Sequence, residues 1–139
     1  MRYLLDTNIV SYALRGQHGI EEKLAAIPKR DLLLSAVVLG EGLTGSYKTA
    51  RPQMLIDLWR SYVAGWELAP FDEACADAYG RIRAHLEQHG RMIGIHDCQI
   101  AATALAYAQT HEVAVTVVTD NMEEFKRVPG LKVVNWVKR

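Results

Sequence analysis

Short apolar runs alternate along this chain with longer segments in which apolar residues recur at helical spacing. The short runs are rich in Val, Leu or aromatic residues, which favours β-strands at Tyr3–Leu5, Leu32–Leu34, Glu67–Leu68, Val115–Val118 and Lys132–Val134. The longer segments predict helices at Ile9–Leu14, Ile20–Ile27, Ala36–Tyr47, Met54–Tyr62, Asp72–His89 and Asp97–Gln109. Strands that alternate with helices indicate an α/β fold with a central parallel sheet and crossover connections.

Two smaller features complete the predicted layout near the end of the sequence. Asp120-Asn121 should begin a short helical turn in which Phe125 faces inward, and Trp136 is expected to pack against the sheet edge. No Pro-, Gly- or Ser-rich linker divides the 139 residues, so we expect residues 1–139 to form one domain.

Composition narrows the class of protein. Sixteen basic and sixteen acidic residues give a formal charge of zero, which alone offers no argument for nucleic-acid binding. The two cysteines, Cys75 and Cys98, show neither a disulfide framework nor metal-ligand spacing. The sequence has no recognisable signal peptide and no apolar run long enough for a bilayer, so we expect a cytoplasmic protein without membrane contact.

Four acidic residues stand where an apolar run gives way to a polar turn or a new helix: Asp6, Glu41, Asp97 and Asp120. In a parallel α/β sheet the carboxyl ends of the strands line one crevice, where these side chains could meet. Carboxylates gathered there would repel one another unless a divalent cation lay between them, and hard cations such as Mg²⁺ take oxygen ligands. The pattern therefore predicts a metal site suited to phosphodiester cleavage.

Each of these acids also has an ordinary structural interpretation. Asp97 and Asp120 could be helix N-caps or turn residues, because Asp is favoured at both positions. Glu41 could lie on a helix surface. Gly40-Glu41-Gly42-Leu43-Thr44-Gly45 matches the G-x-G-x-x-G pattern of dinucleotide-binding loops, although Glu41 would place a negative charge inside the phosphate cradle. A nucleotide-binding module therefore remains an alternative.

Four segments spread over the whole chain resemble a known nuclease family. They are Leu5-Asp6-Thr7-Asn8; Ser35 with Glu41 and Gly45; Gly94-Ile95-His96-Asp97 before Ile100-Ala101-Ala102; and Thr119-Asp120-Asn121 with Phe125 and Val128-Pro129-Gly130-Leu131. Together they resemble a PIN-domain ribonuclease and, more narrowly, the VapC toxins of type II toxin–antitoxin pairs. The resemblance implies a three-layer α/β/α PIN-like fold with a central parallel sheet.

The resemblance also implies an activity and partners. The expected activity is endonucleolytic hydrolysis of RNA, with transfer RNA as the expected substrate, dependent on Mg²⁺ or Mn²⁺ and leaving 5′-phosphate and 3′-hydroxyl ends. The expected partners are a second copy of the chain and a small VapB-type antitoxin protein, with DNA contacted only through the antitoxin. A nuclease acting on DNA and a non-catalytic PIN-like scaffold are the alternatives within the fold.

Carried over residue by residue, the resemblance gives Asp6, Glu41 and Asp97 as catalytic metal ligands. Asp120 is the fourth acid, unless the neighbouring Asn121 takes that position. The expected supports of these ligands are Thr7, Asn8, Ser35 and Thr119. One departure from the family is Gly42 beside Glu41, where a larger apolar residue is usual. Glycine costs about 1 kcal/mol in a helix interior, so we expect this helix to be looser.

Overall fold

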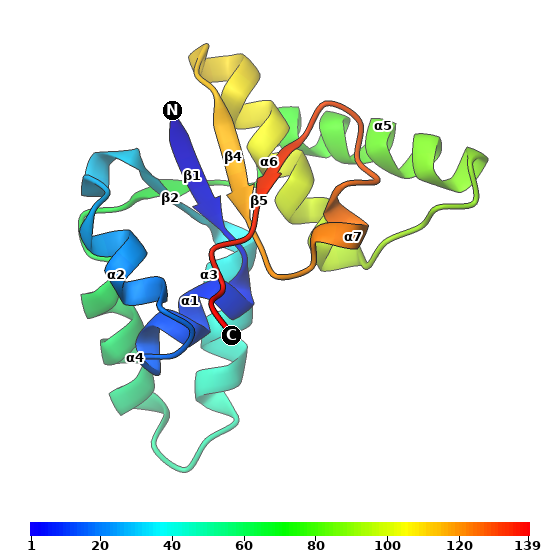
Figure 1. Ribbon diagram of the computed structural model, residues 1–139. Helices are drawn as coiled ribbons and strands as arrows, with labels where there is room; N and C mark the ends of the chain where they lie inside the picture. The colour runs from blue at the N-terminus through cyan, green and yellow to red at the C-terminus, as the bar shows by residue number, and fades with distance from the viewer.

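The computed structural model describes residues 1–139 and contains a five-stranded sheet with helices on both sides (Figure 1). The strands follow the order β3-β2-β1-β4-β5, and every neighbouring pair is parallel. Their bounds are β1 (Arg2–Leu5), β2 (Leu32–Ser35), β3 (Glu67–Ala69), β4 (Val115–Val118) and β5 (Lys132–Val134). The predicted three-layer α/β/α fold with a central parallel sheet is confirmed.

Seven helices and one 3₁₀ turn at Lys29–Asp31 connect the strands. The helices are α1 (Thr7–Leu14), α2 (Ile20–Ala25), α3 (Ala36–Tyr47), α4 (Pro52–Tyr62), α5 (Glu73–Gln88), α6 (Ile95–His111) and α7 (Met122–Phe125). Helices α1, α2 and α4 gather on one side of the molecule, and α5, α6 and α7 on the other (Figure 1). No helix has both the length and the apolar character needed to cross a bilayer.

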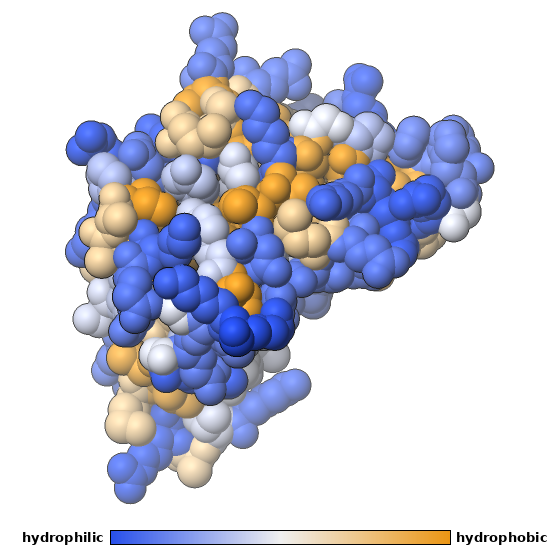
Figure 2. Space-filling view, viewed as in Figure 1, coloured by the Kyte–Doolittle hydropathy of each residue, from blue (hydrophilic) through white to orange (hydrophobic).

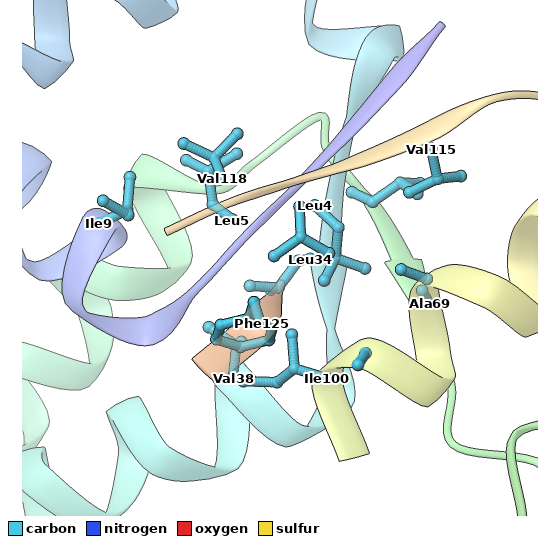
Figure 3. Close-up of a cluster of buried hydrophobic side chains, with 14 of the residues drawn as sticks. Leu4, Leu5, Ile9, Leu34, Val38, Ala69, Ile100, Val115, Val118 and Phe125 are labelled. Atoms are coloured by element: carbon cyan, nitrogen blue, oxygen red, sulfur yellow. The ribbon is translucent and has the colours of Figure 1, made fainter. Parts of the chain in front are cut away.

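The middle of the sheet is buried on both faces. Leu4, Leu5, Val117 and Val118 of the central strands β1 and β4 have no exposed surface. Side chains from the helices close over them, among them Phe125 of α7 (Figure 3). Strands covered on both faces read as continuous apolar runs rather than alternating ones, which explains the pattern seen in the sequence.

Two helices start directly at the carboxyl ends of their strands. Asp6 follows β1 and caps α1, with Oδ1 accepting a hydrogen bond from the Thr7 amide at 2.8 Å. Ser35 ends β2 and caps α3, with Oγ accepting from the Val37 amide at 3.1 Å. These caps begin α1 earlier than its apolar pattern predicts, and they leave no loop between strand and helix.

Residues Gly40–Gly45 do not form the phosphate-binding loop that the G-x-G-x-x-G pattern allowed. They lie inside α3, where the backbone amides are already engaged in helical hydrogen bonds. The interpretation of Gly42 as a source of looseness is also wrong. Gly42 is buried, and a Cβ at this position would stand 2.5 Å from the ring of Trp59 on α4. The glycine lets α3 and α4 approach closely.

The last residues differ slightly from expectation. Phe125 faces inward as predicted and is completely buried. Trp136 is buried too, but it packs on Tyr3 of the central strand β1, with ring centroids 5.1 Å apart, rather than on the sheet edge. On the surface, hydrophobic residues form a band from the middle of the sheet toward α5, between hydrophilic regions (Figure 2).

Candidate active site

The candidate site lies at the carboxyl ends of β1 and β4, the neighbouring strands at which the order of the sheet reverses direction. Crevices at such switch points are the usual binding sites of parallel α/β folds. Leu5 pairs with Val118 in the sheet, so the next residues, Asp6 and Thr119, come out side by side. The Thr119 hydroxyl donates to Asp6 Oδ2 at 2.9 Å.

Asp6 is a buried carboxylate, with only 7 % of its surface exposed. Burial raises its pKa above the ordinary value, and the negative charge of Glu41 acts in the same direction. Hydrogen bonds from the Thr119 hydroxyl and the Thr7 amide oppose this rise by stabilising the charged form. These hydrogen bonds fix the orientation of the carboxylate, and a nearby positive charge would stabilise its ionised form.

Asp97 lies in the first turn of α6, which begins at Ile95, two residues earlier than the sequence pattern predicts. Its pKa is raised to about 7, chiefly by burial and then by its contact with Glu124. The negative charges of Asp6 and Glu124 raise it further, while a hydrogen bond from Asn121 lowers it. Asp97 and Asp6 thus share one electrostatic environment, as the sequence predicted.

Glu41 reaches the same region from the second turn of α3. The Thr7 hydroxyl donates to Glu41 Oε1 at 2.6 Å, and His96 Nδ1 lies 3.2 Å from Glu41 Oε2. Each carboxylate oxygen therefore has one partner that fixes the side chain. Thr7, one of the predicted supports, contacts Glu41 in this way, and His96 is a contact that the sequence resemblance does not supply.

Asp120 is not brought to these acids. Its carboxylate is held by the Arg139 guanidinium, with Nη1–Oδ1 at 3.0 Å and Nη2–Oδ2 at 2.5 Å, and by Asn135 Nδ2 at 3.1 Å. Arg139 keeps the pKa of Asp120 below its ordinary value. The neighbouring Asn121 takes the inward position instead, with Nδ2 donating to Asp97 Oδ2 at 3.2 Å.

A further acid, Glu124, joins the site although the sequence reasoning missed it. Asn121 Nδ2 donates to Glu124 Oε2, and Glu124 also contacts Asp97. The available signal was the short helix expected after Asn121, because residues three apart share a helix face. Of the other predicted supports, Thr119 binds Asp6, Ser35 caps α3, and Asn8 is exposed on the first turn of α1.

By donor type this site fits a hard divalent cation, since the inward side chains offer oxygen atoms: Asp6, Glu41, Asp97, Asn121 and Glu124. No three His, Cys, Asp or Glu side chains are arranged as a ready cage for one ion. Mg²⁺ does not require such a cage, because it keeps several waters and uses one or two carboxylates together with substrate phosphates. A cation would also relieve the repulsion that raises the pKa of Asp97.

Two of the five hollows on the surface help to locate the site. The larger, of about 680 Å³, is a groove between α5 and α6 that none of these acids lines. The smaller, of about 260 Å³, is lined by Thr7 and Glu41 together with Leu58 and Trp59 of α4. The smaller groove borders the candidate site, because Glu41 is one of its lining residues.

Comparison with known proteins identifies the family of this chain. The family model of the PIN domain matches residues 3–131. The chain is 36 % identical to Ribonuclease VapC2 of Rickettsia felis, over 99 % of this chain and 100 % of that protein. It is 28 % identical to a tRNA(fMet)-specific endonuclease VapC of Shigella flexneri, over 98 % of both proteins.

Solved structures share the overall fold. The VapBC2 complex of Rickettsia felis, bound to a DNA fragment from its promoter, contains a chain with a TM-score of 0.85 and 33 % identity, covering 98 % of this chain and 99 % of that one. DNA-bound VapBC from Salmonella typhimurium gives a TM-score of 0.86 and 27 % identity, covering 98 % of both chains.

Proposed function

Since this chain belongs to the PIN domain family and to its VapC ribonucleases, we propose that it is a metal-dependent endoribonuclease, the toxin of a VapBC-type toxin–antitoxin pair. The observation that carries the proposal is that Glu41 of α3 and Asp97 of α6 both approach Asp6, at the switch point of the sheet, closely enough for their negative charges to interact with it. Family membership supports RNA as the substrate, and the site supports the chemistry.

Asp6, Asp97 and Glu41 are the residues that would hold Mg²⁺ or Mn²⁺, with Asn121 and Glu124 beside them. The bound cation would polarise the phosphoryl group and make a hydroxide available near neutral pH. Thr119 and Thr7 keep Asp6 in one orientation, so that its charge is presented to the crevice. Asp97, with its pKa near 7, must release its proton when a cation binds.

Hydrolysis by water in line with the leaving group gives 5′-phosphate and 3′-hydroxyl ends. A 2′,3′-cyclic phosphate would contradict this mechanism, because it requires the ribose 2′-hydroxyl as the nucleophile. For the substrate we propose a transfer RNA, in line with the tRNA(fMet)-specific relative. A DNA nuclease is the alternative, and parallel assays on RNA and DNA separate the two.

We propose a VapB-type antitoxin as the protein partner, as in the similar VapBC complexes. The groove lined by Glu41, Leu58 and Trp59 supports a protein ligand, because exposed apolar side chains, Tyr47 and Met54, belong to the same α3–α4 hairpin. DNA would then be contacted only through the antitoxin. We also propose a homodimer, which light scattering of the purified chain tests.

The test is cleavage of total RNA by the purified chain, with Mg²⁺, with Mn²⁺ and with EDTA, beside Asp6→Asn and Asp97→Asn. Each amide keeps the side-chain shape but removes the charge that binds the cation, so both variants should be inactive and folded. The control is Asp77→Asn, which changes an exposed acid on α5. Metal-independent cleavage, or wild-type rates in either active-site variant, would refute the proposal.

A further inference from the structure

The segment Asn135–Arg139, which we call the strap, leaves β5 and runs toward the loop between α1 and α2 (red in Figure 1). Trp136 anchors its first part in the core. At its far end the Lys138 amide donates to the His18 carbonyl at 2.9 Å, and His18 Nδ1 donates to the Lys138 carbonyl at 3.0 Å. The strap therefore follows a fixed path across the carboxyl end of the sheet.

Arg139, at the end of the strap, forms an ion pair with Asp120. The two guanidinium nitrogens each bind one carboxylate oxygen, at 3.0 Å and 2.5 Å. Asn135, at the start of the strap, donates to the same carboxylate at 3.1 Å. A bidentate ion pair of this kind fixes the orientation of the carboxylate as well as its distance from the guanidinium. Asp120 is thus bound to the strap at two places.

The side chains around Asp120 alternate in direction. Thr119 points inward and donates to Asp6, while Asn121 points inward and donates to Asp97. Asp120 points outward between them, and the Thr119 hydroxyl also accepts from the Asn121 amide at 2.9 Å. Any contact that fixes Asp120 therefore fixes the backbone that carries both inward residues.

We infer that Arg139 is a positioning residue for the active site, acting through Asp120 from outside the crevice. By holding Asp120 it sets the position of Thr119 against Asp6 and of Asn121 against Asp97. Its effect on catalysis rests on the proposed nuclease function, while its effect on the Thr119–Asn121 backbone does not. The inference gives Asp120 the role of an anchor in place of a metal ligand.

Kinetics of three variants test the inference: Arg139→Gln, Asp120→Asn and the double variant. Residues that orient metal ligands typically contribute about 10-fold or more to activity. Each single change should therefore lower the cleavage rate at saturating RNA about 10-fold while leaving KM nearly unchanged. The double variant should be no slower than the slower single variant. If the two residues act only through their contact, either single change already removes the whole effect.

A matched control is Arg81→Gln. Arg81 Nε also binds an aspartate, Asp77 Oδ2, at 2.8 Å on the exposed surface of α5, but Arg81 contacts none of the active-site acids. This variant should cleave RNA at the wild-type rate. A slow Asp120→Asn beside a wild-type Arg139→Gln would overturn the inference, since Asp120 would then act on metal or substrate directly. Losses that multiply in the double variant would overturn it as well.

A second measurement needs no catalysis. Hydrogen exchange of the Asn121 amide, which is bonded to Thr119 Oγ1, should be faster in Arg139→Gln than in wild type and unchanged in Arg81→Gln. Equal exchange in all three proteins would overturn the inference. A wild-type protein that cleaves no RNA would refute the proposed function, and the exchange experiment would still decide the role of the strap.

Discussion

The ring of Trp59 lies directly over Gly42, so that a Cβ at position 42 would stand 2.5 Å from Trp59 Cζ2. Gly42 is the residue after Glu41, and Trp59 belongs to α4, so this contact determines how α4 packs on the helix that carries an active-site acid. The glycine and the tryptophan form a complementary pair in which one residue leaves the space that the other fills.

Gly42→Ala should therefore destabilise the protein, although alanine favours helix formation by about 1 kcal/mol. Forcing a methyl group into a packed contact costs about 1–3 kcal/mol, which is the larger effect. Urea denaturation should show the loss, and cleavage should fall because Glu41 moves. Gly40→Ala is the control: nothing lies within 4 Å of its added Cβ, so that variant should be as stable as wild type or more so. A stabilised Gly42→Ala would contradict the packing argument.

Glu124→Gln should reduce RNA cleavage about 10-fold, the usual effect of removing a partner of a metal ligand. The amide keeps a contact with Asn121 but no longer places a negative charge beside Asp97, so the pKa of Asp97 should fall. Single-turnover cleavage and Mn²⁺ titration calorimetry measure the two effects. Glu123→Gln, which changes the adjacent exposed acid paired with Arg127, should behave as wild type. Equal behaviour of the two variants would remove Glu124 from the site.

The metal-free protein should lose stability as the pH rises through about 7. Asp97 binds its proton more tightly when folded, with a pKa of about 7 against an ordinary value of 3.8. Its contribution to folding is therefore fully present below a pH of about 4, and disappears as the pH passes the folded-state pKa. Urea midpoints measured in EDTA across this range check the trend. Asp97→Asn should give a shallower profile, whereas identical profiles would show that Asp97 titrates normally.

Asp6→Asn should be inactive yet at least as stable as wild type in EDTA near neutral pH. Burial raises the pKa of Asp6, so its negative charge opposes folding there. In the variant the amide oxygen can still accept from the Thr7 backbone amide, while the NH2 group replaces the second oxygen and can donate to the Thr119 hydroxyl. Melting temperatures with and without Mn²⁺ check this expectation. Added metal should raise the melting temperature of wild type only. A variant that melts far below wild type in EDTA would indicate that the charge stabilises the fold.

Much of the fold could be predicted from the sequence because its strands are buried on both faces. Runs such as Val115–Val118 are apolar throughout, and the helices between them are long enough to identify. The helix starts were less predictable, since polar residues in the first turns of α1 and α6, Thr7-Asn8 and His96-Asp97, interrupt the apolar period. The N-cap residues set these two starts: Asp6, at the end of β1, precedes α1, and Gly94, in the turn after α5, precedes α6.

The position of a site residue could be predicted where it depends only on residues near it in the sequence. Asp6 directly follows a predicted strand, so its position at the carboxyl end of the sheet follows from the fold. Which of Asp120 and Asn121 points into the site depends on Arg139, which lies nineteen positions after Asp120. No local sequence pattern reveals that contact. Gly42 was misread for the same reason, because its partner Trp59 lies on another helix.

The hydrogen bond from Thr119 to Asp6 joins residues that are 113 positions apart. During synthesis the ribosome releases β1 first, but the place beside it in the sheet stays empty until β4 has emerged. A nascent chain that stops before β4 carries Asp6 and Glu41 without Thr119, Asn121 or Glu124. An enzyme that destroys RNA therefore completes its active site only after the segment from β4 to Glu124 has left the ribosome.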